Sequence, residues 1–382
     1  MMGHTLELDD VHTDSKTHIG TVVVPAAWAM AEYLNKTGEE FLLAVICGYE
    51  TMARIGMAFD VSSHRNRGWH VTSTAGTFGA AAACARLMGL DEDRTVAALG
   101  LAGTQSFGVW AFLADGASNK VLHPARAAAV GCESALLARA GMTGPEYVLT
   151  AEDGGILAAM SDNPHPELVC SQLGERWHIL EMDNKPYPCC RSTHCAIDGI
   201  LRIRRDHGLR PQEVESIQVS TYLVGNKQCG MSRGSRQPRN PVDAKFSIPY
   251  TVAAALLHGN VALEHFHPEY INDPEVQELL RRVKVVTDPC YTEKYPSHWG
   301  CRVTVKCQDG RVLKQEIEDA SGSVYNPLDE EQVKEKVAGL IKGSFGDRTD
   351  QIVAAILSIP KCSSLPVILA KMTSRDLTVP TG

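Results

Sequence analysis

The sequence has few aromatic residues, no excess of positive charge and no long apolar segment, and each lack excludes a class of protein. Aromatic residues make up 6% of the 382 residues, and 37 Lys and Arg against 45 Asp and Glu give a net charge of −8. A surface that binds DNA or RNA is broadly basic. A membrane span needs about 18 uncharged apolar residues in a row, and a signal peptide needs a basic start. We therefore expect a cytoplasmic protein that binds neither nucleic acid nor a membrane.

Paired cysteine and histidine ligands are also missing. The 12 Cys residues form no Cys-x-x-Cys pair, and the 14 His residues are scattered along the chain. A structural zinc site needs ligands paired at short spacing, and a chain of this length does not depend on disulfide bonds for its stability. The pattern predicts reduced thiols and no dedicated metal site.

Residues 1–178 are predicted to form a helical domain. From residue 21 to about residue 140 the chain consists of Ala-rich segments of helical length, with apolar residues every three to four positions and Gly near the end of each segment. Asp91 is a favourable N-cap, and Glu39 and Glu40 lie in a predicted first turn, where the helix dipole favours negative charge. The abundance of Gly and Ala indicates helices that pack closely.

Residues 179–328 are predicted to form a smaller α+β domain, in which helical segments alternate with strands. The strand-like segments, in which β-branched residues alternate with polar ones, are residues 214–223, 281–288 and 301–319. Asp309-Gly310 interrupts the last of them and is a strong hairpin signal. We expect a small antiparallel sheet.

Residues 329–382 return to a helical pattern. A helical hairpin has more apolar surface than the small α+β domain can cover, so these residues are predicted to pack on the helical domain. The two domains would then be discontinuous in sequence, with a cleft between them. The predicted fold class is mainly α.

Four segments carry more polar residues than packing requires. The first, residues 4–20, contains three His, four acidic residues and one Lys just before a predicted helix. It is either a solvated loop or an active-site loop in which His18, Asp9 and Asp10 meet a substrate, since catalytic groups are often carried by loops on a rigid scaffold.

The second and third segments each precede an apolar helix. Residues 68–80 place His70 before a Gly-rich helix start, where free amides favour an anion; helix packing is the alternative, and the dinucleotide-binding pattern is absent. In residues 115–126, Lys120 follows a turn. It is either an exposed surface lysine or a lysine held against the helices, where desolvation would suit a general base or a carboxylate ligand.

The fourth segment, residues 184–194, gathers positive charge around two Pro residues. Its potential cations are Lys185, Arg191 and His194. Three cations within eleven residues favour a polycarboxylate ligand. A nucleophilic Cys189 or Cys190 is the alternative, although nothing in the sequence marks either thiol as activated.

These segments, in this order, resemble the MmgE/PrpD family, which includes 2-methylcitrate dehydratase, cis-aconitate decarboxylase and iminodisuccinate epimerase. The resemblance covers nearly the whole chain, and its most specific parts are GWHVTSTAGTFGAAAACARLMGLD, GASNKVLHPARAA, KPYPCCRSTH and DAKFSIPYTVAAALLHG. It implies a large helical domain with a smaller α+β lid, an active site between them and a homodimer. It also implies chemistry without a metal or an organic cofactor.

The resemblance also implies site residues. By position, they are His18 at the end of the acidic loop, His70, Lys120, Lys185, Cys190 and Tyr250. The sequence departs from the decarboxylase pattern at Glu7 (Asp in the pattern), Val11 (Thr) and Cys190 (His). The chain begins inside the family's first motif, so we expect either a trimmed helical domain or a sequence that is incomplete at its start.

The shared chemistry is transfer of a proton at a carbon next to a carboxylate, which needs a base and cations that stabilise the developing charge. We assign His70 and Lys120 as the proton-transfer pair, without deciding which is the base, and Tyr250 as a hydrogen-bond donor. The residues expected to hold carboxylates or line their site are His18, Lys185, Arg191, Cys190, Asp9, Asp10 and His194. The chain is then a lyase acting on a small di- or tricarboxylate, an isomerase of an imino- or amino-dicarboxylate, or an inactive family member.

Overall fold

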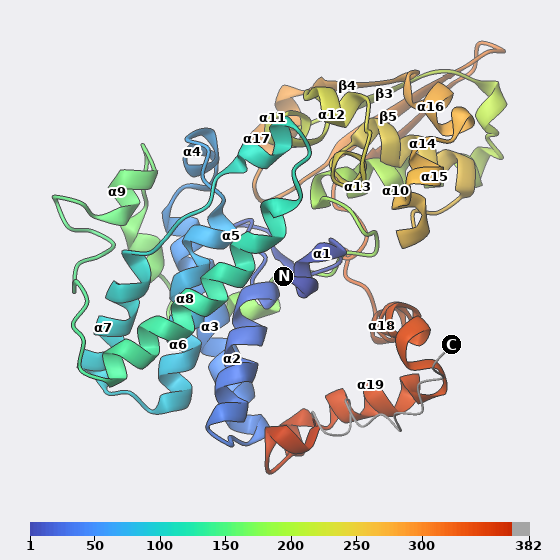
Figure 1. The fold of residues 1–382 in the computed structure, drawn as a ribbon. Helices are drawn as coiled ribbons and strands as arrows, with labels where there is room; N and C mark the ends of the chain where they lie inside the picture. Colours follow the sequence, from blue (N-terminus) through green and yellow to red (C-terminus); the bar gives the residue numbers. More distant parts are fainter. Residues whose placement is uncertain (369–382) are drawn as a thin grey trace.

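The computed structural model describes residues 1–368, which form a helical domain, a smaller α+β lid and a C-terminal pair of helices (Figure 1). The long helices of the first domain are α2 (Gly20–Tyr33), α3 (Gly38–Ala58), α6 (Gly76–Met88), α7 (Glu92–Gly103) and α8 (Leu122–Arg139). Its short helices are α1 (Met2–Thr5), α4 (Val61–Asn66), α5 (Val71–Thr74) and α9 (Ile156–Met160). The predicted mainly helical fold is confirmed.

Side-chain and glycine caps set the helix boundaries, among them the predicted cap at Asp91. Thr37 and Glu40 form a reciprocal capping box at the start of α3, and the Asp91 side chain accepts a hydrogen bond from the Arg94 amide at the start of α7. Gly89 ends α6 in the left-handed conformation, which glycine adopts at no steric penalty. These caps satisfy backbone groups that have no partner inside the helix.

Helix α6 lies against both α3 and α8, and small residues allow this close approach. A Cβ atom at Gly131 in α8 would lie 2.3 Å from Ala80 Cβ and 2.5 Å from the Ala81 backbone nitrogen. At Gly79 it would lie 2.7 Å from Met52 Cβ in α3. The Ala and Gly richness of the sequence therefore serves helix packing.

We expect Gly131→Ala to destabilise the protein by about 1–3 kcal/mol, because the new methyl group meets backbone that cannot move aside. Gly339→Ala is the matched control, since Gly339 lies in a helix and a Cβ there meets nothing within 4 Å. That control should leave stability unchanged or raise it by up to about 1 kcal/mol. Calorimetry on both variants checks this, and equal melting temperatures would contradict it.

Among the described residues, α3 alone is long and apolar enough to cross a membrane by length and composition. Its apolar window is 67% buried inside the protein. Met52 and Ala53 of this helix are completely buried in the core of the helical domain. Helix α3 therefore has the burial of a core helix.

The lid contains a four-stranded sheet in the order β4-β3-β5-β6. Its strands are β3 (Val214–Thr221), β4 (Val283–Thr287), β5 (Cys301–Cys307) and β6 (Val312–Ile317). Strands β5 and β6 form the predicted hairpin around Asp309-Gly310. The expectation of an antiparallel sheet is wrong for one pair, because β3 and β4 are parallel. Several helices separate these two strands and carry the chain back to the same end of the sheet.

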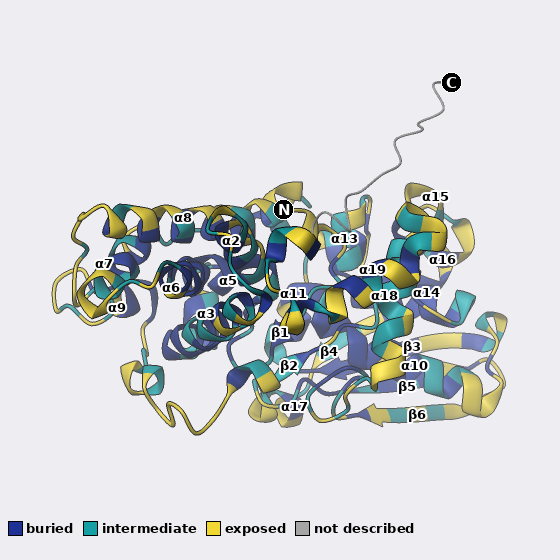
Figure 2. Ribbon diagram, turned by 90° about the horizontal axis from the view of Figure 1, so that it is seen from below, coloured by how far each residue is buried: buried dark blue, intermediate teal, exposed yellow. Residues whose placement is uncertain are grey.

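Helices α10 (His194–His207) and α14 (Ile248–His258) pack on this sheet and form the lid core with it. The shorter lid helices are α11 (Leu223–Cys229), α12 (Arg233–Arg236), α13 (Pro241–Lys245), α15 (Pro268–Ile271), α16 (Pro274–Leu280) and α17 (Pro289–Lys294). Figure 2 shows buried residues inside both domains, while edge strand β6 and the outer side of α7 are largely exposed.

Two connections join the parts of the chain. Strand β1 (Val11–His12) of the acidic loop pairs with β2 (Met182–Asp183) at the start of the lid. After the lid, α18 (Glu330–Phe345) and α19 (Thr349–Leu357) lead back to the helical domain (Figure 1). There the Gly38 amide donates to the Cys362 carbonyl, and the Leu365 amide donates to the Lys36 carbonyl. Residues 369–382 of the predicted C-terminal segment lie outside the described residues.

Candidate active site

A cavity lies between the helical domain and the lid, and we refer to it as the interdomain cavity. The space within it that is accessible to water is about 40 Å³. The acidic loop, the segment from α4 to α5 and the turn before α8 line it on one side, and Cys190–Ser192, Gln228 and Trp299 line it from the lid.

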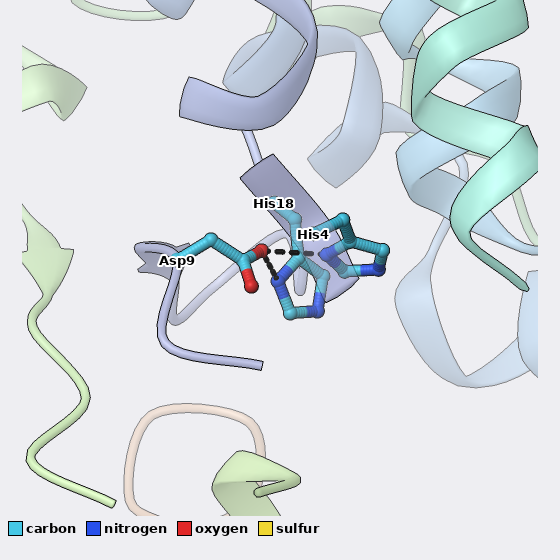
Figure 3. Close-up of side chains that lie close together, drawn as sticks. All are labelled: His4, Asp9 and His18. Carbon is cyan, nitrogen blue, oxygen red and sulfur yellow. Dashed lines mark hydrogen bonds and ion pairs between the residues drawn. The ribbon is translucent and has the colours of Figure 1, made fainter. Parts of the chain in front are cut away.

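Asp9 holds two imidazoles of the acidic loop (Figure 3). Its Oδ2 lies 2.8 Å from His4 Nδ1 and 2.6 Å from His18 Nδ1. Burial opposes ionisation, but His4, Lys185 and His18 together hold the pKa of Asp9 well below its usual range. Burial lowers the pKa of His18 to about 3. Asp9 therefore orients a neutral His18 ring, whose Nε2 remains available at the cavity wall.

Lys120 and Lys185 converge on Glu7 from the two domains. Lys120 Nζ forms an ion pair with Glu7 Oε1 and lies over the Phe246 ring, and Lys185 Nζ lies 3.2 Å from Glu7 Oε2. Lys120 is 4% exposed and Lys185 is completely buried, so the alternative of an exposed surface lysine is wrong for Lys120. Although burial opposes it, the lysine charges hold the pKa of Glu7 well below its usual range.

His70 lies beside Lys120 at the start of α5 and is 1% exposed. Its Nδ1 is 2.9 Å from Nδ1 of His123, and its ring packs edge-on against Trp110. Burial, with the charge of Lys120 second, holds the pKa of His70 well below its usual range. A neutral imidazole whose Nδ1 is fixed by a neighbour can exchange a proton at Nε2.

Cys190 and Arg191 bring the lid to the same cavity. A hydrogen bond with the Cys229 thiol lowers the pKa of Cys190, whereas burial raises that of Cys189 to about 12. Arg191 Nε donates to Asp183 Oδ2 over 2.8 Å, and the guanidinium also donates to two lid carbonyls. Arg191 therefore lines the cavity while its charge is already compensated.

We expect Asp183→Ala to destabilise the protein by about 3–5 kcal/mol, because it leaves the buried Arg191 charge without its partner. Glu316→Ala removes an exposed ion pair with Arg302 and should change stability by less than about 1 kcal/mol. Denaturant unfolding of the two variants checks this contrast. Similar losses in both would contradict the structural role of the buried pair.

Five of the predicted site residues lie outside the cavity lining. Asp9 and Lys185 contact the lining residues His18 and Glu7, and the other three make packing contacts instead. Asp10 accepts hydrogen bonds from the Gly20 amide and the Tyr49 hydroxyl, and burial raises its pKa to about 6. The Tyr250 hydroxyl donates to the His265 carbonyl within the lid core. The remaining residue, His194, is buried with its Nε2 at 3.3 Å from the Cys189 carbonyl oxygen. The structure thus gives all three a role in packing.

Sequence reasoning did not single out Lys16, Arg65 or His123. Lys16 and Arg65 line the cavity, and His123 contacts His70 behind its wall. Lys16 belongs to the acidic loop that was singled out, but a single Lys among polar residues gave no signal of its own. His123 lies in the HPAR sequence three residues after Lys120, which is the one signal that could have found it.

Two groups of three side chains within residues 1–368 bring possible metal ligands together. They are His4, Asp9 and His18, and His12, His178 and Glu181. In the first group, Lys185 Nζ lies 3.8 Å from Asp9 Oδ1. In the second, Arg176 Nε and Nη2 donate to the two Glu181 oxygens over 2.7 and 2.8 Å. Protein cations already compensate both carboxylates, which disfavours a metal ion in either place.

A helical domain and an α+β lid that meet at a cavity lined by buried lysines and imidazoles are typical of an enzyme that binds its substrate between two domains. The chain belongs to the MmgE/PrpD family. Residues 1–169 match the MmgE/PrpD N-terminal domain, and residues 187–359 match the MmgE/PrpD C-terminal domain. The family predicted from the four segments is confirmed.

Curated relatives match across both domains. The cis-aconitate decarboxylase-like protein oryM of Aspergillus oryzae is 29% identical over 96% of this chain and 79% of its own length. The cis-aconitate decarboxylase of Homo sapiens is 28% identical over 96% of this chain and 77% of its own. The 2-methylcitrate dehydratase of Cupriavidus necator is 25% identical over 61% of this chain and 49% of its own. The decarboxylase and the dehydratase are lyases.

Proposed function

We propose that this protein is a lyase that acts on a small tricarboxylate. The observation that carries the proposal is the interdomain cavity itself, which Lys120 and the imidazoles of His18 and His70 line, while Lys185 pairs with Glu7 of the same lining. Carboxylates are bound best by cations that are desolvated and held in place. The decarboxylases and dehydratases among the relatives support the same class of reaction.

The residues divide the chemistry between them. Asp9 and Glu7 raise the pKa of Lys185 despite its burial, so Lys185 stays charged and can bind a substrate carboxylate. His70 and Lys120 lie together and exchange the proton at the carbon next to that carboxylate. His18, oriented by Asp9, is a third proton-transfer group at the cavity wall. The cations stabilise negative charge that develops on the carboxylate in the transition state.

The substrate that we propose differs from cis-aconitate. All three positions that depart from the decarboxylase pattern, Glu7, Val11 and Cys190, line the interdomain cavity. Changes at three lining positions alter the shape and charge that a substrate meets. An isomerase that inverts a carbon next to a carboxylate is the second candidate, because His18 and His70 come from separate segments and could serve opposite faces of that carbon.

Incubation with 2-methylcitrate, cis-aconitate and iminodisuccinate in deuterated water tests the proposal. A lyase releases water or carbon dioxide, which nuclear magnetic resonance and headspace analysis detect. An isomerase incorporates deuterium and changes the configuration without loss of a fragment. Turnover of iminodisuccinate alone would replace the lyase by the isomerase, and no change in any compound would favour an inactive family member.

We also propose a homodimer, which the family resemblance implies. Sedimentation velocity at micromolar concentration is expected to give a particle of twice the 41.5 kDa chain mass. Exposed Leu122 and Leu136 on α8 offer apolar surface that a second copy could cover. A compact monomer at that concentration would rule the dimer out.

A further inference from the structure

The cations of the interdomain cavity fall into two groups with different partners. Lys120, Lys185 and Arg191 each form an ion pair with a carboxylate of the protein. Lys16 and Arg65 line the same cavity, and within residues 1–368 neither has a carboxylate oxygen within 4.0 Å. The second group therefore has no carboxylate partner in the described part of the protein.

Arg65 is held by an aromatic ring in place of an acid. Its guanidinium carbon lies 4.4 Å from the centre of the Trp110 ring, which fixes the plane of the group. Its Nε is buried and has no hydrogen-bond partner among the described residues. A buried donor without a partner is unfavourable, so a ligand oxygen at this position would remove the penalty.

Lys16 approaches the same region from the acidic loop. Its Nζ lies 4.8 Å and 5.0 Å from the ring centres of Tyr295 and Trp299, and 3.4 Å from the Gln228 amide oxygen. Burial lowers the pKa of Lys16 to about 7, and the neighbouring charge of Arg65 adds to that effect. Lys16 and Arg65 therefore repel one another when both are charged, and an anion bound between them would relieve that repulsion.

We propose that Lys16 and Arg65 form a separate subsite for one carboxylate of the substrate, distinct from the carboxylate that Lys185 binds. The subsite deepens the proposed function and rests on it, because it assigns the substrate at least two carboxylates, one for Lys185 and one for Lys16 and Arg65. A carboxylate bound there accepts hydrogen bonds from Arg65 Nε and Lys16 Nζ. The aromatic rings of Trp110, Trp299 and Tyr295 exclude water around it and strengthen both bonds.

Binding of tricarballylate tests the subsite without turnover, because this saturated tricarboxylate carries no hydroxyl group to eliminate and no double bond. Calorimetric titration of the wild-type protein should show tighter binding of tricarballylate than of butyrate, which has one carboxylate and can fill only one subsite. Lys16→Met and Arg65→Met should each weaken tricarballylate binding by about 10–100-fold, the effect of losing a hydrogen bond to a charged group. Both should also reduce the preference over butyrate.

Arg67→Met is the matched control, because Arg67 lies two residues from Arg65 but is exposed and paired with Asp162. It should bind tricarballylate within twofold of wild type. If circular dichroism shows that Lys16→Met does not fold, the tricarballylate affinities of Lys16→Arg and Arg65→Met are measured in its place. Wild-type binding in Arg65→Met, or a wild-type protein that binds no tricarballylate at millimolar concentration, would overturn the subsite. Loss of binding in the variants together with no turnover of any candidate substrate would keep the subsite and reject the lyase.

Discussion

Lys120→Ala is expected to lower kcat by about 10²–10⁴-fold on the true substrate, the range for loss of a general acid or base. Lys120 lies against Glu7 and beside His70 and is 4% exposed, so bulk water is a poor replacement for it as an acid or base. Glu7 keeps Lys185 as a partner in the variant, and the fold should therefore survive. Steady-state kinetics with circular dichroism of the variant measure both effects.

Arginine at the same position should not restore turnover. Its guanidinium stays charged at working pH, and its planar shape differs from that of an ammonium group. Lys227→Ala is the control, because Lys227 is exposed and precedes Gln228 of the cavity lining. Near-normal kcat in Lys120→Ala would refute the assignment, and an equal loss in Lys227→Ala would show that the assay does not report on the cavity.

Asp9→Asn is expected to lower kcat by at least about 10²-fold. An amide has the shape of the carboxylate but only one acceptor oxygen and no charge. Both rings contact the same carboxylate oxygen, Oδ2, so an amide that keeps its oxygen there turns its nitrogen toward Lys185, which lies 3.8 Å from Oδ1. The negative charge beside His18 and Lys185 is then lost. The kcat–pH profile should change along with kcat, since the charge next to the imidazole is gone.

Asp14→Asn is the matched control for Asp9. Asp14 lies in the same acidic loop but pairs with Arg176 at the surface. Its replacement should leave kcat within a few-fold of wild type. An Asp9→Asn enzyme with unchanged kcat and pH profile would mean that the Asp9–His18 pair serves the loop's structure and not its chemistry.

Local patterns predicted the elements of this fold well and their relative directions less well. Periodicity and caps located α3 and α7, and the Asp309-Gly310 turn identified the β5–β6 hairpin. The same alternation of residues occurs in parallel and antiparallel strands, so it could not show that β3 and β4 run in the same direction. That direction depends on the whole connection between them.

Cavity residues could be predicted where a motif fixes the backbone near the cavity. They were missed where the direction of the side chain determines whether it reaches the cavity. His70 and Lys120 each precede a helix at the cavity wall, and both were identified. Tyr250 lies in an equally specific motif, but its side chain points into the lid core. Lys16 reaches the cavity because the pairing of β1 with β2 anchors its loop across the two domains. The residues near Lys16 carry no sequence pattern that predicts this pairing.

Glu7 joins a lysine of each domain, and this sharing makes substrate binding an exchange of partners. An incoming carboxylate competes with a resident one, so its affinity is the difference between two ion pairs and not the full strength of either. The resident carboxylate also keeps the empty cavity close to electrical balance, which spares the fold the repulsion between two buried ammonium groups. The protein would then select the anion that binds both lysines more favourably than Glu7 does.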